Sequence, residues 1–271
     1  MPSAFLDDRG LLRIAGEDAR SFLQGLVTCD MDKVSPQAAG FGALLTPQGK
    51  ILFDFLIVAE GDDFLLDVDA GLAAALIKRL SMYRLRARVS LSQDHANGVL
   101  ALWDGAVSDG LDYEDPRHAG LGRRAILPRE AAASTATATP ADYEMLRILC
   151  GVPRGGVDFA YGDVFPHDAI MDLIHGLDFR KGCYVGQEVV SRMEHRGAAR
   201  KRIVPVRLRG PAPAPGTEIR AGGIAIGLMG SAANDRGLAM IRTDRAEDAM
   251  AAGQELVAGA SIVELLPANM P

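Results

Sequence analysis

The sequence predicts an α+β protein of several lobes, in which antiparallel or mixed sheets precede a small C-terminal β-barrel. Up to about residue 103, short strand-like runs alternate with two amphipathic helices, as expected for an α+β lobe. Beyond residue 202 the chain shows short strand-like runs separated by turns rich in Gly and Pro, which is typical of a small barrel or sandwich. We therefore expect a region at 1–202, built from two intertwined lobes, and a β-barrel domain at 203–271.

The first lobe is expected to contain a central strand at 51–59. This run is nearly all apolar, and the turn Thr46-Pro47-Gln48-Gly49-Lys50 joins it to the preceding strand. Asp54 interrupts the run, either as a strand residue that faces water, the commoner case, or as a buried carboxylate. The other predicted elements of this lobe are strands at 11–14, 41–45, 64–68, 88–92 and 99–103 and helices at 17–26 and 70–85.

The middle of the chain is expected to form a helix at about 140–150. Thr139 supplies a cap, Pro140 occupies the first helical position, and Gly151-Val152-Pro153 ends the helix. Residues 128–140, dominated by Ala, Thr and Ser, are predicted to be a surface connection. In the C-terminal domain, strands are predicted at 203–208, 218–219, 225–231, 237–242 and 261–266.

Composition and charge restrict the class of protein. The chain has 271 residues, of which 48% are hydrophobic and 24% charged, as in ordinary globular proteins. Its net charge of −6 argues against nucleic-acid binding, and no apolar run is long enough to span a membrane, so we expect no membrane partner. No signal peptide is visible at the N-terminus.

Three scattered cysteines, Cys29, Cys150 and Cys183, argue against a disulfide framework and for a reducing compartment. We therefore expect a cytoplasmic protein. No two of them have metal-ligand spacing, and a four-thiolate iron–sulfur cluster needs more cysteines, so no metal ligand is predicted. The histidines, including His167, are predicted to be surface or capping residues.

The most specific stretch of the chain is Lys181-Gly182-Cys183-Tyr184-Val185-Gly186-Gln187-Glu188. It places a thiol beside Lys181 and close to a predicted helix that begins after Gly186. A nearby cation and a helix N-terminus both favour the thiolate form of a cysteine. The alternative is that Cys183 is a small core residue, as most lone cysteines are.

This stretch resembles the Lys-Gly-Cys-Tyr-x-Gly-Gln-Glu signature of the YgfZ-type folate-binding proteins of iron–sulfur cluster maintenance. These proteins are related to the aminomethyltransferase, or T-protein, of the glycine cleavage system. Tyr143, Arg147, Gly151 and Pro153 are similar to a second element of the same family. The resemblance implies a T-protein-like fold, tetrahydrofolate as the bound cofactor, and iron–sulfur client or assembly proteins as partners.

The resemblance also implies which residues form the site. Cys183 and Lys181 are expected to be the catalytic pair, with Lys181 lowering the pKa of the Cys183 thiol. The pterin of a folate requires carboxylate partners and an aromatic slot, and its glutamate tail requires cations. Which carboxylate contacts the pterin stays open, and Tyr143 and Tyr184 are equally compatible with being core aromatics. The expected cofactor-binding residues are Tyr143, Arg147, Tyr184, Gln187, Glu188 and Arg192.

A basic cluster surrounds the signature. Its interpretation is either a solvated face or the mouth of an anion-binding site, and the position beside Cys183 favours the mouth. We further expect the first two lobes to enclose a cleft with Lys181, Cys183 and Tyr184 at its wall. The members of the cluster are Arg180, Lys181, Arg192, Arg196, Arg200, Lys201 and Arg202.

Three classes of function compete on this evidence. The first is a folate-binding accessory protein in the assembly or repair of iron–sulfur enzymes. The second is a tetrahydrofolate-dependent aminomethyltransferase or demethylase, with a transferase-like activity. The third, an RNA-binding module, depends only on the basic cluster and conflicts with the acidic overall charge. Cys183 discriminates between the first two, because the signature cysteine belongs to the maintenance proteins and is not used by the T-protein.

Overall fold

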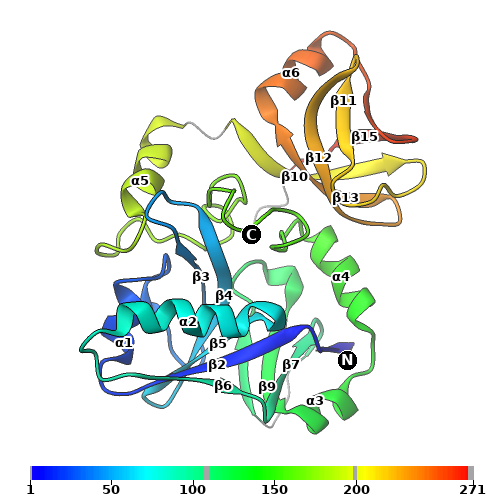
Figure 1. Ribbon diagram of the computed structural model, residues 1–271. Coiled ribbons are helices and arrows are strands. Elements are labelled where there is room, and N and C mark those ends of the chain that lie inside the picture. Colours follow the sequence, from blue (N-terminus) through cyan, green and yellow to red (C-terminus); the bar gives the residue numbers. More distant parts are fainter. Residues whose placement is uncertain (1, 106–109, 198–199, 268–271) are drawn as a thin grey trace.

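The computed structural model describes residues 2–105, 110–197 and 200–267 (Figure 1). Its first lobe is a five-stranded sheet in which every neighbouring pair of strands is antiparallel. Across this sheet the strands are Gly40–Leu45 (β3), Ile51–Glu60 (β4), Asp63–Asp69 (β5), Arg9–Ala15 (β2) and Ser90–Asp94 (β6).

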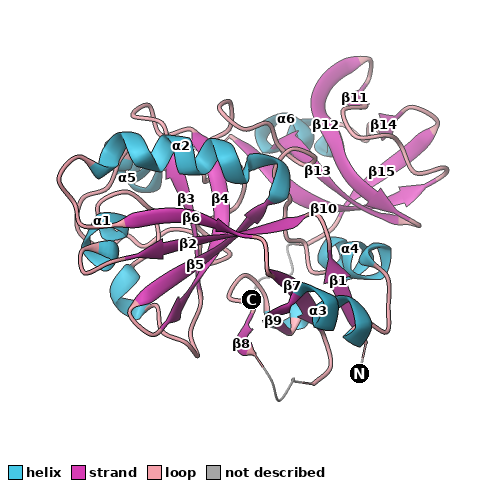
Figure 2. Cartoon of the chain, turned by 60° about the horizontal axis from the view of Figure 1, so that its bottom comes forward, coloured by secondary structure: helices cyan, strands magenta, loops and turns pink. Residues whose placement is uncertain are grey.

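Both faces of this sheet are buried. In β4, Phe53, Phe55 and Ile57 pack on the side of helices α1 (Ala19–Gln24) and α2 (Ala73–Arg84), while Leu56 and Val58 pack in the core on the opposite face. Figure 2 shows α2 lying across the sheet. The prediction of a central, nearly all-apolar strand is therefore confirmed, because side chains of a strand alternate between two buried faces.

The second lobe is a four-stranded antiparallel sheet with two helices. Helix α4 (Pro140–Leu149) begins as predicted, since Thr139 and Asp142 form a reciprocal capping box and Pro140 opens the helix. The strands, in order across the sheet, are Ser3–Leu6 (β1), Asn97–Leu102 (β7), Arg123–Pro128 (β9) and Leu111–Glu114 (β8).

The predicted surface connection at 128–140 is wrong in part, because Arg129–Thr135 forms helix α3. Its Ala132 is buried against Leu100 and Leu102 of β7. An alanine-rich segment has high helix propensity. This segment also packs on an apolar surface of β7, which its composition alone did not indicate.

The C-terminal part closes into a six-stranded barrel with one helix, α6 (Thr243–Ala251). The predicted boundary between residues 202 and 203 falls inside its first strand. The barrel strands, in order around it, are Lys201–Arg209 (β10), Arg236–Arg242 (β13), Ile224–Ala233 (β12), Glu218–Ala221 (β11), Leu256–Ala258 (β14) and Ser261–Leu265 (β15).

A long irregular segment joins α4 to helix α5 (Gln187–Arg196) and carries the signature. Its apolar side chains, among them Phe159, Val164, Met171 and Tyr184, are buried in the same core as the facing sides of both sheets. This packing fixes the position of the signature relative to the first lobe, although the segment has little regular secondary structure.

Candidate functional site

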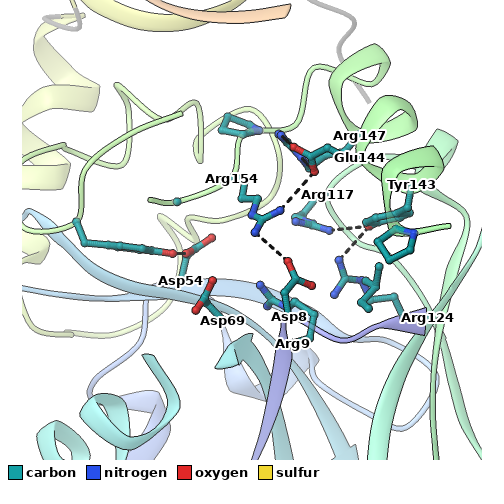
Figure 3. Close-up of a pocket in the computed structure, with 15 residues that line it drawn as sticks. Asp8, Arg9, Asp54, Asp69, Arg117, Arg124, Tyr143, Glu144, Arg147 and Arg154 are labelled. Carbon is teal, nitrogen blue, oxygen red and sulfur yellow. Dashed lines mark hydrogen bonds and ion pairs between the residues drawn. The ribbon is translucent and has the colours of Figure 1, made fainter. Parts of the chain in front are cut away.

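A charged pocket lies where the first two sheets meet helix α4 (Figure 3). Carboxylates and guanidinium groups line it in nearly equal number, so a ligand with both an amidine-like edge and an acidic end would find complementary groups. The charged residues are Asp8, Arg9, Asp54, Asp69, Arg117, Arg124, Glu144, Arg147 and Arg154, and Tyr143 and Tyr161 accompany them.

Two buried aspartates hold three of these arginines in place. Asp67 accepts a hydrogen bond from Arg9 Nε at 2.6 Å and pairs with Arg124. Asp115 accepts from Arg117 Nη2 at 2.6 Å and from Arg124 Nε at 3.2 Å. Burial alone would raise the pKa of both carboxyls, but the adjacent guanidinium groups hold each pKa below its usual range. The paired carboxylates and guanidinium groups of this network therefore stay charged, and they lie where the two sheets meet.

Tyr143 lines this pocket, but its hydroxyl group is already engaged. Arg124 Nη2 donates to the hydroxyl at 2.9 Å and Arg117 Nη2 at 3.3 Å, and the side chain is 5% exposed. The ring packs in the core beside Trp103, with the ring centroids 6.1 Å apart. The reading of Tyr143 as a core aromatic therefore holds, together with a place at the pocket wall.

Arg147 also lines the pocket, yet its guanidinium group bonds to the protein. It donates to Glu144, to Asp158 at 2.9 Å and to Ser231 at 2.6 Å, and it is 3% exposed. Since Ser231 belongs to β12, this side chain connects α4 to the barrel. The expected binding of a folate tail by Arg147 would require these contacts to break.

Arg154 lies at a partly exposed edge of the pocket. Arg154 pairs with Asp8 at 2.9 Å and with Glu144 at 3.7 Å, as Figure 3 shows. Its side chain is 37% exposed. The volume of the pocket is only about 60 Å³, less than the ~300 Å³ or more of a typical ligand pocket, so a folate would fit only if lining side chains moved.

Asp54 also lines the pocket, although it was not among the predicted site residues. It is half-buried and accepts a hydrogen bond from the Tyr161 hydroxyl, and burial followed by the negative charge of Asp54 raises the pKa of Tyr161. Of the two expected positions, a face turned to water or a buried site, Asp54 takes neither fully, since it is half-buried at the pocket wall. The signal that could have found it was a carboxylate inside an otherwise apolar central strand.

Lys181 is turned away from the surface, contrary to expectation. It is 7% exposed, and its ammonium group donates to the carbonyl oxygens of Val27, at 2.6 Å, and Cys29, at 2.7 Å. Burial lowers the pKa of Lys181. The cation thus stabilises the Val27–Cys29 segment of the first lobe, and the expected pairing of Lys181 with the Cys183 thiol does not match these contacts.

The three cysteines differ sharply in accessibility. Cys183 is exposed, whereas Cys29 and Cys150 are buried. Burial raises the pKa of Cys29 to about 12 and that of Cys150 to about 11. Lys181 partly opposes the shift at Cys29, so the thiol that the lysine influences belongs to a residue 152 positions away. The alternative that Cys183 is a core residue is wrong.

Tyr184 is 7% exposed and contributes to the core, and burial raises its pKa to about 12. The Lys181 ammonium lies over its ring at 5.3 Å. Neither Lys181, Tyr184 nor Cys183 lines the charged pocket. The predicted site is therefore divided: Tyr143 and Arg147 are at the pocket, while the signature residues lie near α5, on the other side of the molecule in Figure 1.

Helix α5 begins directly after Gly186, which has a φ of 84°. A Cβ at this position would lie 2.6 Å from the carbonyl oxygen of Thr46, in the β3–β4 turn. Gln187 is the first residue of the helix and is half-buried. Glu188 and Arg192 are exposed and form an ion pair of 2.7 Å with each other. The signature glycine thus has a packing role against the first lobe.

The basic cluster does not form a single free patch. Lys181 is buried, Arg192 pairs with Glu188, and Arg202 forms a bidentate pair with Asp172 at 2.6 and 3.2 Å. The side chain of Arg196 lies outside the described residues. Three of the seven cations are thus engaged by the protein, which weakens the reading of the cluster as the mouth of an anion site.

Comparison with solved structures shows a T-protein-like fold. The structure of the glycine cleavage system aminomethyltransferase T from Bartonella henselae superimposes with a TM-score of 0.75, covering 98% of this chain and 84% of that chain, at 16% identity. A family model of the CAF17 C-terminal beta-barrel domain matches residues 200–271. Both findings agree with the predicted fold class. At 16% identity, the structural similarity shows the fold alone.

Sequence relatives identify the family. The chain is 32% identical to human mitochondrial iron-sulfur cluster assembly factor IBA57, over 89% of this chain and 77% of the human protein. The mouse protein is 31% identical over 88% of this chain and 77% of its own length. The Neurospora crassa homolog is 33% identical over 74% of this chain, which spans about half, 52%, of that relative.

These relatives are named as mitochondrial proteins, and this finding overturns the expectation of a cytoplasmic protein. Among the residues that the structure describes, no helix has the length and apolar character needed to cross a membrane. On the identity to the human protein and the coverage of both chains, this chain belongs to the family of the iron–sulfur cluster assembly factor IBA57.

Proposed function

We propose that the chain is a folate-binding accessory protein of the YgfZ type that assists the assembly or repair of iron–sulfur enzymes through the Cys183 thiol. Family membership supports the iron–sulfur role. The observation that carries the role of the cysteine is that Cys183, within the signature, is exposed while Cys29 and Cys150 are buried.

An exposed single thiol suits a transient role. A cluster requires about four protein ligands, and this chain has three cysteines with only one at the surface. Cys183 would therefore act together with ligands from an iron–sulfur client or assembly protein, either as a temporary iron ligand or as a redox-active sulfur. Its position on an irregular segment ahead of α5 leaves it accessible to such a partner.

The charged pocket supports the folate part of the proposal. Asp54 and Asp69 offer carboxylates to the amide-rich edge of a pterin, and Arg154 at the partly exposed edge of the pocket offers a forked cation to the glutamate tail. The ion pairs of Arg154 with Asp8 and Glu144 are partly exposed, so exchanging them for a ligand carboxylate costs little free energy.

An aminomethyltransferase or demethylase is the second candidate, raised by the resemblance of the sequence to the T-protein family, and aminomethyltransferase T shares the fold. Related folds host different chemistry, so the similarity does not decide between the two activities. Since the transferase does not use the signature cysteine, the two candidates predict different effects of replacing Cys183.

The decisive experiment is complementation of a strain that lacks the gene, with iron–sulfur enzyme activity and glycine cleavage measured side by side. We expect Cys183→Ser to fail to restore the iron–sulfur enzymes, while the control Cys150→Ala, at a buried thiol, restores them. Melting temperatures of both purified variants exclude misfolding as the cause. Full rescue by Cys183→Ser would overturn the proposal, and a glycine-cleavage defect that Cys183→Ser repairs would favour the transferase.

A further inference from the structure

A histidine and two carboxylates meet where α5 packs on the irregular segment before the signature. Each of these side chains offers one possible ligand atom, and the three atoms lie within 4.8 Å of one another; the residues are His167, Asp172 and Glu194. His167 is 2% exposed, so its expected place at the surface is wrong. Glu194 lies 27 residues after His167, on α5, and no local sequence spacing reveals the group.

The distance within this group fits shared coordination. His167 Nε2 and Glu194 Oε2 are 3.2 Å apart. Two ligands with bonds of 2.0–2.1 Å to one tetrahedral ion are separated by about 3.3 Å. The two atoms therefore already have the spacing that a common metal ion requires, without movement of either element.

The imidazole of His167 is buried and incompletely hydrogen-bonded. Its Nδ1 is buried and has no hydrogen-bond partner among the described residues. If Nε2 carries the proton and donates to Glu194, the Nδ1 lone pair has no donor. If Nδ1 carries it, the Nε2 lone pair faces a carboxylate, which has no proton to donate. A cation at Nε2 would replace the repulsion between that lone pair and the carboxylate, while the Nδ1 proton would still have no acceptor among the described residues.

The charge around the group also favours a cation. Asp172 and Glu194 supply two negative charges, and Arg202, which pairs with Asp172, supplies one positive charge. A carboxylate has about four lone-pair positions, of which the bidentate Arg202 occupies two, so Asp172 retains capacity for a metal. With a neutral imidazole, Asp172, Glu194 and Arg202 together carry one net negative charge.

We propose that His167, Asp172 and Glu194 bind a divalent first-row transition-metal ion. One imidazole and two carboxylates form a mixed nitrogen and oxygen donor set of the kind that zinc, manganese and ferrous iron accept. The ion would connect α5 to the segment at 163–175. The His167 ring lies 6.1 Å, centroid to centroid, from that of Phe179, four residues before Cys183, so the ion would stabilise the base of the signature segment.

The test is metal binding by the full chain after removal of metals with a chelator. Because an exposed thiol also binds metals, all proteins carry Cys183→Ser. Zn²⁺ and Mn²⁺ are measured by equilibrium dialysis, and Co²⁺ by its visible absorption. We expect one equivalent to bind with a Kd below about 0.1 mM, a higher melting temperature with metal, and no thiolate-to-cobalt band.

His167→Gln is expected to weaken binding at least tenfold, as is Glu194→Gln, whose side chain is 45% exposed and so tolerates substitution without loss of the fold. His195→Gln, an exposed histidine on the same helix, is the matched control and should bind as tightly as the parent. Absence of binding of all three ions would overturn the proposal, and so would equal affinity of the His167→Gln and His195→Gln proteins. In either case the His167–Glu194 contact is only a hydrogen bond or an ion pair.

Discussion

The ammonium group of Lys181 donates a hydrogen bond of 2.7 Å to the carbonyl oxygen of Cys29. The lysine of the signature therefore contacts the first lobe, and Cys183, two residues later, is exposed. Lys181 was expected to activate the Cys183 thiol. Its contacts instead fix the position of the segment that carries Cys183. This changes which consequences are expected when either residue is replaced.

The first prediction concerns thiol reactivity. At neutral pH, iodoacetamide should alkylate Cys183 at least tenfold faster than Cys29 or Cys150, because burial excludes the reagent and raises the pKa of the two buried thiols to about 12 and 11. Mass spectrometry of peptides gives the three rates. In urea the rates should converge. Equal rates in the folded protein would show that the buried positions are wrong.

Replacing Lys181 should reduce stability and leave the reactivity of Cys183 nearly unchanged. Lys181→Met leaves the Val27 and Cys29 carbonyls without a donor, which costs about 2 kcal/mol of unfolding free energy. Urea unfolding checks this value, and Lys33→Met, at a side chain 65% exposed, is the control with an expected change below about 0.5 kcal/mol. A marked slowing of Cys183 alkylation in Lys181→Met would restore the direct electrostatic role.

The two glycines that flank α5 allow a matched comparison. Gly186→Ala and Gly197→Ala both place a side chain at positive φ, which costs about 1 kcal/mol each. Only at Gly186 does the added Cβ meet backbone, 2.6 Å from the Thr46 carbonyl oxygen, while the described atoms leave the Gly197 position open. We therefore expect Gly186→Ala to be the more destabilising by about 1–3 kcal/mol in urea unfolding. Equal effects would mean that the signature glycine has no packing role.

The sequence allowed the regular elements and the presence of a signature to be predicted, because both depend on local patterns. The nearly continuous apolar run of β4 and the capping residues before α4 are local, and the structure agrees with both predictions. The partners of Lys181 and the contact of Asp54 with Tyr161 depend on which distant segments meet, and no spacing along the chain contains that information. Helix α3 was missed because its stability derives from packing of Ala132 on β7.

The buried ion network predicts a dependence of stability on pH. Asp67 and Asp115 have lowered pKa values in the folded protein, so their contribution is complete above the unfolded pKa of about 3.9 and is lost as the pH falls through the folded values. Unfolding by urea, followed through the single tryptophan Trp103, should therefore show a steep loss of stability below about pH 4.

Asp115→Asn tests the same network. It leaves Arg117 and Arg124 buried without one carboxylate and should cost about 3–5 kcal/mol at pH 7, with a shallower loss of stability in acid. Glu218→Gln, which removes an exposed pair with Arg220, should change stability by less than about 1 kcal/mol. If Asp115→Asn were as mild as this control, the buried network would not contribute to stability.

The last prediction concerns folate at the charged pocket. We expect the purified protein to bind tetrahydrofolate, more tightly with a polyglutamate tail and less tightly at high salt, since exposed charges are screened over about 10 Å at 0.1 M ionic strength. Arg154→Ala should weaken binding about tenfold, the loss of one charge-assisted hydrogen bond, and should remove most of the salt dependence. Calorimetry at two salt concentrations measures both effects.

Arg209→Ala, at a cation 67% exposed on the barrel, is the control and should bind like the parent. Because Arg154 pairs with Asp8 and Glu144 at the edge of the pocket, a variant that bound tetrahydrofolate more tightly would show that the arginine only obstructs the pocket and does not contact the tail.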